Sequence, residues 1–85
     1  MATEAVPRLT LYSREGCHLC SDMHAALHAL RRTHVFDCEI VDVDASAELN
    51  QRYGDRVPVL ACGAQELCHA RLDAAAVTAF LQQFR

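Results

Sequence analysis

The sequence predicts an α/β fold in which a mixed four-stranded sheet is flanked by helices. The predicted order is strand, helix, strand, helix, strand, strand, helix. Apolar residues make up 52% of the chain and charged residues 22%, a balance typical of a chain that folds around a core. The apolar residues repeat with the period of a strand in some segments and with that of a helix in others. The first strand–helix–strand unit should be parallel and right-handed, and the last two strands should form an antiparallel hairpin.

The first strand is predicted at residues 8–12, where polar and apolar side chains alternate. Ser13 to Gly16 interrupts the alternation, and a helical pattern then runs from Cys17 to about His34. The helix face expected to be buried repeats at spacings of three and four: Leu19, Met23, Leu27 and Leu30. Charges should complement the helix dipole, with Asp22 in the first turn and Arg31, Arg32 and His34 in the last.

The second strand is predicted from Phe36 to Val43, ending near Asp44. Phe36, Cys38 and Ile40 alternate with acidic residues, so these three side chains should point toward the core. Residues 45–53 should then form a short helix that is capped by Asp44 or Ser46 and ended by Gly54.

The third strand is predicted at residues 57–62, with Pro58 near its start. A turn at residues 63–65 and a short return strand at residues 66–70 complete a hairpin. Asp73 should cap the final helix, whose apolar residues form one face: Val77, Phe80, Leu81 and Phe84.

Length and charge exclude several classes of protein. Eighty-five residues suit one domain, spanning residues 1–85. The net charge of −3, from 8 basic and 11 acidic residues, argues against a nucleic-acid binder, which should carry a basic patch. No apolar run approaches the roughly 20 residues that a membrane span needs, and residues 1–7 do not resemble a signal peptide. We therefore expect a soluble, cytoplasmic monomer.

The five cysteines point to redox or metal chemistry at one close pair. Their number is odd, and only Cys17 and Cys20 lie near each other in the sequence. The pair follows a strand and a glycine and opens a helix, where unpaired backbone N–H groups and the helix dipole favour a thiolate. Cys20 lies one turn further on, so its sulfur can reach that of Cys17. Cys17 should attack a disulfide, and the more buried Cys20 should then resolve the mixed disulfide.

Val57-Pro58 is the second candidate element of the site. A proline at the start of a strand inside a compact domain is compatible with a cis peptide bond, which is largely a proline feature. In that case Val57 could offer its N–H and C=O to an extended substrate that carries a thiol. The alternative is a trans proline on an edge strand.

Two segments resemble glutaredoxins. Tyr12-Ser13-Arg14-Glu15-Gly16-Cys17-His18-Leu19-Cys20 is similar to the glutaredoxin active-site segment, and residues 53–60 to the segment that carries the cis-proline. The resemblance covers residues 8–84 and is closest to small bacterial glutaredoxin-like proteins. It implies a thioredoxin-like, glutaredoxin-type βαβαββα fold, with Cys17 as nucleophile, Cys20 as resolving thiol and Pro58 in cis. It also places Arg14 where glutaredoxins have a basic residue that helps to hold the glycine carboxylate of glutathione.

The chain departs from the glutaredoxin pattern at three places. His18-Leu19 replaces the usual Pro-Tyr, and a protonated His18 could favour the Cys17 thiolate, or could simply be a solvated helix residue. Cys68-His69 falls on the Gly-Gly pair that lets glutathione approach the backbone closely, so only part of the glutathione site is matched. Arg56 stands where threonine is usual, and Arg56 and Arg14 could attract an anionic peptide or be ordinary surface arginines.

The remaining cysteines and histidines have structural interpretations. Cys38 should be a small buried apolar residue, and Cys62 and Cys68, which could face each other across the hairpin, should stay unpaired in a reducing cytosol. His24 and His28 have a spacing that can bind metal, but without a clear third ligand they are expected on a solvated face. His34 should serve the C-terminus of its helix. No metal site is predicted.

Three functions compete. The leading one is a thiol–disulfide oxidoreductase that reduces protein or small-molecule disulfides, with no bound cofactor and with electrons from glutathione or a reductase. The second is a binding module in which Cys17 and Cys20 hold a metal or an iron–sulfur cluster, which would need thiolates from a second copy or from outside. The third is a regulatory domain that has kept the fold without turnover. The substrate-binding residues predicted for the first function are Arg14, His18, Arg56, Val57 and Pro58.

Overall fold

The computed structural model describes residues 6–84, and it confirms the predicted mixed four-stranded sheet. None of the helices in this part of the chain is long and apolar enough to cross a membrane. The strands are β1 (Arg8–Ser13), β2 (Asp37–Asp42), β3 (Val59–Cys62) and β4 (Gln65–His69). The α-helices are α1 (His18–Leu30), α2 (Ala47–Tyr53) and α3 (Ala74–Leu81), with short 3₁₀ turns at Val43–Ala45 and Gln82–Phe84.

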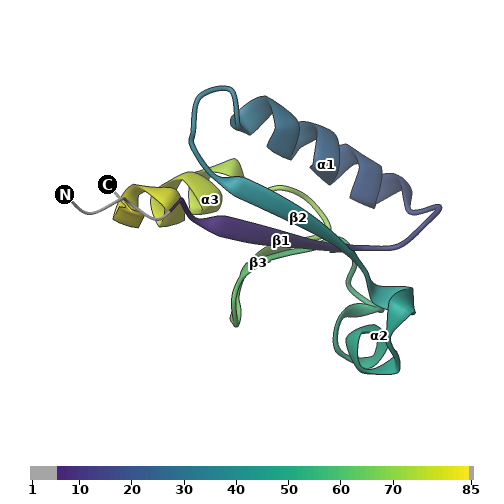
Figure 1. The fold of residues 1–85 in the computed structure, drawn as a ribbon. Coiled ribbons are helices and arrows are strands. Elements are labelled where there is room, and N and C mark those ends of the chain that lie inside the picture. Colours follow the sequence, from purple (N-terminus) through teal and green to yellow (C-terminus); the bar gives the residue numbers. More distant parts are fainter. Residues whose placement is uncertain (1–5, 85) are drawn as a thin grey trace.

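The sheet has the strand order β2-β1-β3-β4 (Figure 1). β1 and β2 are parallel, with Arg8 opposite Asp37 and Ser13 opposite Asp42. β1 and β3 are antiparallel, as are β3 and β4, whose pairing shifts register between Leu60 and Ala61. β2 and β4 are therefore the two edge strands of the described sheet.

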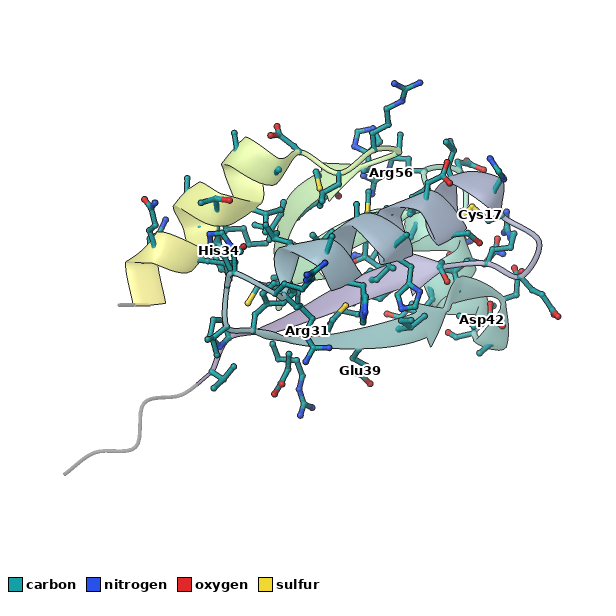
Figure 2. All side chains as sticks on the ribbon, turned by 90° about the horizontal axis from the view of Figure 1, so that it is seen from above. Cys17, Arg31, His34, Glu39, Asp42 and Arg56 are labelled. Carbon is teal, nitrogen blue, oxygen red and sulfur yellow. A yellow bond between two sulfur atoms is a disulfide. The ribbon has the colours of Figure 1, made fainter. Side chains whose placement is uncertain are left out.

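The helices cover the two faces of the sheet unequally (Figure 1). α1 and α3 pack on one face over the larger core cluster, which consists of Leu9, Leu11, Met23, Leu27, Phe36, Leu60, Val77, Phe80 and Leu81. α2 covers only one end of the other face, over a smaller cluster of Val43, Tyr53 and Val59. In that smaller cluster the rings of Tyr12 and Tyr53 stack with their centroids 4.0 Å apart. Cys17 lies at the end of α1 opposite to Arg31 (Figure 2).

The buried face of α1 differs from the predicted one at its first turn. Leu19 was expected in the core but is 42% exposed, whereas Cys20 is buried together with Met23 and Leu27. Cys20, Met23 and Leu27 follow at spacings of three and four and point to the sheet, which leaves Leu19 at the rim of that face. The prediction for Leu19 is therefore wrong. The residue of this turn that is buried instead is Cys20, the second cysteine of the close pair.

α1 is also shorter than predicted. It ends at Leu30, because the N–H groups of Arg32 and Thr33 bond to carbonyls three residues back and tighten the chain into a turn. The charges expected in its terminal turns are displaced as well. Asp22 lies beyond the first turn, and only His28 is a basic residue of the last. His34 serves the helix end through its backbone, since its N–H donates to Leu30 O at 3.0 Å, and its ring lies 2.9 Å from the Thr33 hydroxyl.

The predicted alternation of buried and exposed side chains holds only in part in β2, because β2 is an edge strand. Phe36 is buried and Cys38 half-buried, but Ile40, expected in the core, is 50% exposed. Ile40 pairs with Leu11 on one side only, because no described strand lies beyond β2. The strand ends at Asp42, earlier than predicted, and Val43–Ala45 forms a 3₁₀ turn.

The caps of α2 and α3 come from short polar side chains. Ser46 Oγ accepts a hydrogen bond from Leu49 N at 3.3 Å, so Ser46 rather than Asp44 caps α2, and Gly54 ends it as predicted. Asp73 Oδ1 accepts from Ala76 N at 3.0 Å, which confirms the predicted cap of α3. Val77, Phe80 and Leu81 form its buried face. The side chain of Phe84, predicted on the same face, lies outside the described residues.

The hairpin is displaced from its predicted bounds by one or two residues. β3 begins at Val59 rather than Val57, because Pro58 has no N–H to donate to the sheet. Cys62 pairs with Gln65, and Cys68 with Leu60, so these two thiols do not face each other, and both are free.

A strained turn follows β4. Ala70 has a φ of 67°, in the left-handed region that favours glycine, and Arg71 N donates to His69 O across it at 2.7 Å. Ala70 N in turn donates to Pro58 O at 2.8 Å. The strained residue therefore holds the segment before α3 against the loop that carries Pro58.

Replacing Ala70 by glycine should raise the free energy of unfolding by about 0.5–1 kcal/mol. The substitution removes the strain of an L residue in the left-handed region, which costs about 1–2 kcal/mol. Part of this gain in stability is offset because glycine loses more conformational entropy on folding. Urea unfolding of Ala70→Gly would measure it, with Ala79→Gly in α3 as a control that should lower stability by a similar amount. Equal destabilisation by both changes would contradict the argument from strain.

Candidate redox site

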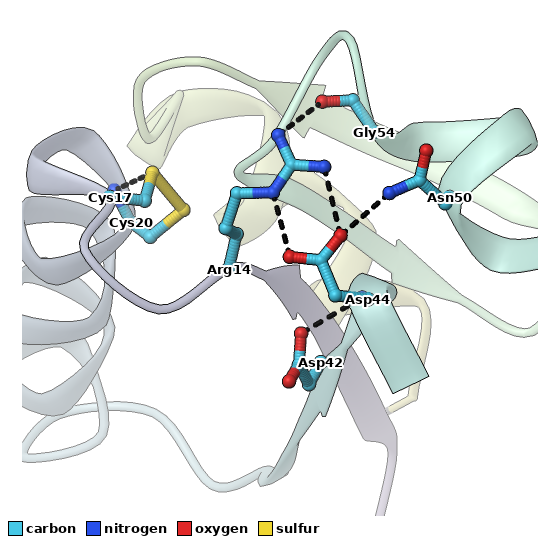
Figure 3. Close-up of polar contacts among 7 residues, drawn as sticks. All are labelled: Arg14, Cys17, Cys20, Asp42, Asp44, Asn50 and Gly54. Carbon is cyan, nitrogen blue, oxygen red and sulfur yellow. Dashed lines mark hydrogen bonds and ion pairs between the residues drawn. A yellow bond between two sulfur atoms is a disulfide. The ribbon is translucent and has the colours of Figure 1, made fainter. Parts of the chain in front are cut away.

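The close cysteine pair occupies the N-terminus of α1 (Figure 3). Cys17 is the N-cap residue, Cys17 and Cys20 form a disulfide, and their Cα atoms lie 5.2 Å apart. Cys17 Sγ accepts a hydrogen bond from Cys20 N at 3.1 Å. Gly16, with a φ of 79°, provides the positive φ by which the chain turns from β1 into the helix. The backbone thus directs a helix N–H group at the first sulfur, as thiolate stabilisation requires.

The two sulfur-bearing residues differ in exposure. Cys17 is half-buried, whereas Cys20 is only 5% exposed. Cys20 belongs to the face of α1 that packs on the sheet, and Cys17 precedes the first helical turn. An external disulfide can therefore approach Cys17 and is kept from Cys20.

Arg14 joins the loop before the cysteines to the region around α2 (Figure 3). Its Nε and Nη2 donate to the two carboxylate oxygens of Asp44 at 3.0 and 3.1 Å, and its Nη1 donates to Gly54 O at 3.3 Å. Asn50 Nδ2 donates to the same carboxylate at 2.6 Å. The carbonyl of Arg14 accepts from Cys17 N at 3.2 Å. One residue thus connects the cysteine loop with α2 and with the segment that leads to Pro58.

This ion pair shifts the titration of both partners. The hydrogen bond from Arg14 is the main reason that the pKa of Asp44 lies below its ordinary value, and the bond from Asn50 adds to the effect. The hydrogen bond to Asp44 likewise raises the pKa of the Arg14 guanidinium.

Both candidate binding arginines have ion-pair partners within the chain, and their predicted roles toward a substrate stay predictions. Asp44 occupies the carboxylate-binding side of Arg14, so that guanidinium is not free for a ligand carboxylate. Arg56 Nη1 lies 2.7 Å from both carboxylate oxygens of Glu66, and its Nη2 donates to Arg52 O at 3.2 Å. Each arginine that was considered for attracting an anion already has an internal anion beside it.

Asp44 and Glu66 are the residues that the sequence interpretation missed. Asp44 is thirty positions from Arg14, and the sequence suggested for it only a possible role as a helix cap, with Ser46 as the alternative. The usable signal is the parallel pairing of β1 and β2, which sets Ser13 opposite Asp42 and so brings the residues after both strands together.

The other predicted site residues differ in exposure. The His18 side chain is 90% exposed, with Nε2 3.7 Å from the Asp22 carboxylate. Pro58 is fully buried, Val57 is half-buried, and the peptide bond between them is cis. Neither His18 nor Val57 contacts a sulfur through a described hydrogen bond, and their predicted roles toward a substrate stay predictions.

Two of the three cysteines outside the pair, Cys38 and Cys68, are poor candidates for nucleophiles. Burial raises the pKa of the Cys38 and Cys68 thiols, which keeps them protonated at neutral pH. Among residues 6–84, no group of three or more histidine, cysteine or acidic side chains is arranged to hold a metal ion.

Removing the Asp44 charge should make folding stability less sensitive to acid. The pKa of Asp44 in the folded protein lies below its ordinary value of 3.8. The stability that the charged carboxylate contributes is therefore fully present above pH 3.8, and it is lost as the pH falls through the pKa of the folded state. Asp44→Asn removes that contribution, so its urea midpoint should fall less than that of the wild type between neutral and strongly acidic pH. Asp37→Asn, at an exposed position of β2, controls for the loss of one carboxylate. An unchanged acid dependence in Asp44→Asn would contradict the assignment.

Comparisons with known proteins agree with this geometry. A family model described as a glutaredoxin-like domain (DUF836) matches residues 8–82. The NMR structure of protein Ne2328 from Nitrosomonas europaea is 40% identical, with a TM-score of 0.82 over 95% of this chain and 99% of that one. The crystal structure of protein XcR50 from X. campestris is 36% identical, with a TM-score of 0.66 over 88% and 96%. A malarial protein at 13% identity and TM-score 0.62, covering 94% and 98%, is similar in fold alone. No curated protein matches the chain.

Proposed function

The chain belongs to the glutaredoxin-like domain family, as its sequence predicts, and on that premise we propose that it is a thiol–disulfide oxidoreductase. The observation that carries the proposal is the Cys17–Cys20 disulfide at the N-terminus of α1, with an accessible first and a buried second cysteine. This is the arrangement by which a dithiol passes two electrons to a substrate disulfide.

The proposed reaction has two steps. The Cys17 thiolate attacks one sulfur of the substrate disulfide, a Cys17–substrate disulfide forms, and the first substrate thiolate leaves. Cys20 then attacks the Cys17 sulfur, the bond to the substrate breaks, and the second substrate thiolate leaves. The substrate gains two electrons and the Cys17–Cys20 disulfide remains, which is the form that the structure holds.

The proposed substrates are disulfides of proteins or small molecules. In this proposal His18, Val57 and Pro58 contribute to substrate binding, and Val57 would pair with an extended substrate backbone. The internal ion pairs of Arg14 and Arg56 favour a substrate that does not depend on these two guanidinium groups. Electrons would come from glutathione or from a reductase, and we propose that the protein works as a monomer in the cytoplasm, without a bound cofactor.

A titration of the purified protein in glutathione redox buffers, read by alkylation and mass spectrometry, would test the function. We expect a Cys17–Cys20 disulfide with a midpoint between about −180 and −270 mV, the interval spanned by thioredoxin, glutaredoxins and protein disulfide isomerase. A Cys20→Ser variant that carries glutathione on Cys17 would identify glutathione as a competent donor. If Cys17 and Cys20 stay reduced in every buffer, the redox function fails and metal binding by the two thiols becomes the function to test.

A further inference from the structure

A hollow of about 200 Å³ lies beside the dithiol, between the loop before α1, the side of α1 and β2. Both cysteines of the pair line it, and so does His24, which stands four residues after Cys20 on the same helix. Residues at this spacing are neighbours on a helix surface. The imidazole and the buried thiol thus share one hollow on one side of α1.

The second step of the proposed reaction raises a proton problem at Cys20. A thiol must lose its proton to attack, and Cys20 is almost completely shielded from solvent. The sheet offers no base there. It contributes Leu11 and Ser13 from β1 and Ile40 from β2, and neither an alkyl side chain nor a serine hydroxyl accepts a proton at neutral pH. Arg14 is a cation already bound to Asp44. Of the described residues lining the hollow, only Glu15 and His24 carry a side chain that ordinarily accepts a proton at neutral pH.

We propose that His24 accepts the proton of Cys20 in the resolving step. The proposal rests on the oxidoreductase function above and assigns the general base of its second half. The Cys20 S–H proton passes to an imidazole nitrogen of His24, and a new bond forms between the Cys20 and Cys17 sulfurs. The bond between Cys17 and the substrate sulfur breaks, and the substrate leaves as a thiolate that solvent or the imidazolium protonates. Imidazole suits this role, because it exchanges protons in the neutral range and a carboxylate such as Glu15 is a weaker base.

Other charged and titratable groups face His24 from each neighbouring element. Arg14 and Glu15 line the same hollow from the loop. A smaller hollow of about 50 Å³ continues along α1 and β2, and there His24 is accompanied by His28, Arg31 and Cys38. His28 lines only the smaller hollow, which does not include Cys20. His28 is therefore a matched control for any effect of removing an imidazole from this helix.

The two steps can be timed separately with the reduced protein and one equivalent of dithiobis(nitrobenzoate). Attack by Cys17 releases the first thionitrobenzoate, and attack by Cys20 releases the second. His24→Ala should slow the second release about tenfold near neutral pH and leave the first unchanged, a modest loss for a general base because water can also take the proton. His28→Ala should change neither. Added imidazole should restore the second release in His24→Ala, which a purely structural role for His24 would not allow.

Several outcomes would overturn the assignment and leave the proposed function intact. One is a second release as fast in His24→Ala as in the wild type. Another is a slowed release that imidazole does not restore, and a third is the same slowing in Glu15→Gln but not in His24→Ala. Failure of the function itself looks different, because no first release would then come from Cys17 in any variant. Mass spectrometry of the quenched adduct identifies the reacting cysteine in each case.

Discussion

Replacing Cys17 by serine should abolish disulfide reduction, with a loss of at least about 10³-fold in turnover. A serine hydroxyl is not ionised at neutral pH, and loss of a covalent nucleophile removes most of the rate enhancement of an enzyme. The position matters as much as the residue type, because Cys17 is the accessible sulfur and receives the helix N–H of Cys20. The measurement is reduction of insulin disulfides driven by dithiothreitol.

The other cysteines make this experiment specific. Cys20→Ser should keep the first step and accumulate a mixed disulfide on Cys17, which mass spectrometry detects. Cys62→Ala, a change at a thiol outside the pair, should leave turnover close to that of the wild type. Turnover that survives in Cys17→Ser would rule out the mechanism described above and would favour a domain whose role does not involve this thiol.

Replacing Leu60 by alanine should lower the free energy of unfolding by about 2–5 kcal/mol. Leu60 is fully buried at the centre of the sheet, where it pairs with Leu11 of β1 and Cys68 of β4 and belongs to the larger core cluster. Truncating such a side chain leaves a cavity that close packing cannot refill. Against a total stability of about 5–15 kcal/mol, this loss should be visible as a large shift of the urea midpoint.

Ile40→Ala is the matched control for this prediction. Ile40 has a side chain of the same size and pairs with the same Leu11, but it is half exposed on the edge strand. Its truncation removes less buried surface and should cost about 1 kcal/mol or less. Equal losses of unfolding free energy in the two variants would contradict the prediction that the deeper burial of Leu60 makes its side chain more stabilising.

The order of helices and strands followed from periodicity because each segment has one face in the core. The details that failed depend on contacts between distant segments. Leu19 and Cys20 are adjacent in the sequence, and either could have belonged to the buried stripe of α1. Only the position of the sheet decides that Cys20 lies inside and Leu19 at the rim. Ile40 shows the same dependence, since its exposure reflects the strand order and not the alternation around it.

The dithiol could be placed from the sequence because its chemistry is local. Cys17 and Cys20 lie within one helical turn, so spacing and a helix start are sufficient to predict their contact. The surroundings of the dithiol are not local. The ion pair between Arg14 and Asp44 depends on the pairing of two parallel strands, and the positive φ of Ala70 is one that glycine would be expected to occupy. A charged residue that the sequence alone suggests as a ligand-binding residue can therefore be part of an ion pair within the protein.

The composition of β2 has a consequence for concentrated protein. As an edge strand, β2 presents unpaired backbone N–H and C=O groups along one side, and such a strand can recruit a second chain into an intermolecular sheet. Three of its six residues are acidic: Asp37, Glu39 and Asp42. Glu39 and Asp42 lie along this edge of the molecule (Figure 2). Two such edges brought together would face each other with like charges, so the acidic residues of this edge strand disfavour the pairing of two chains through it.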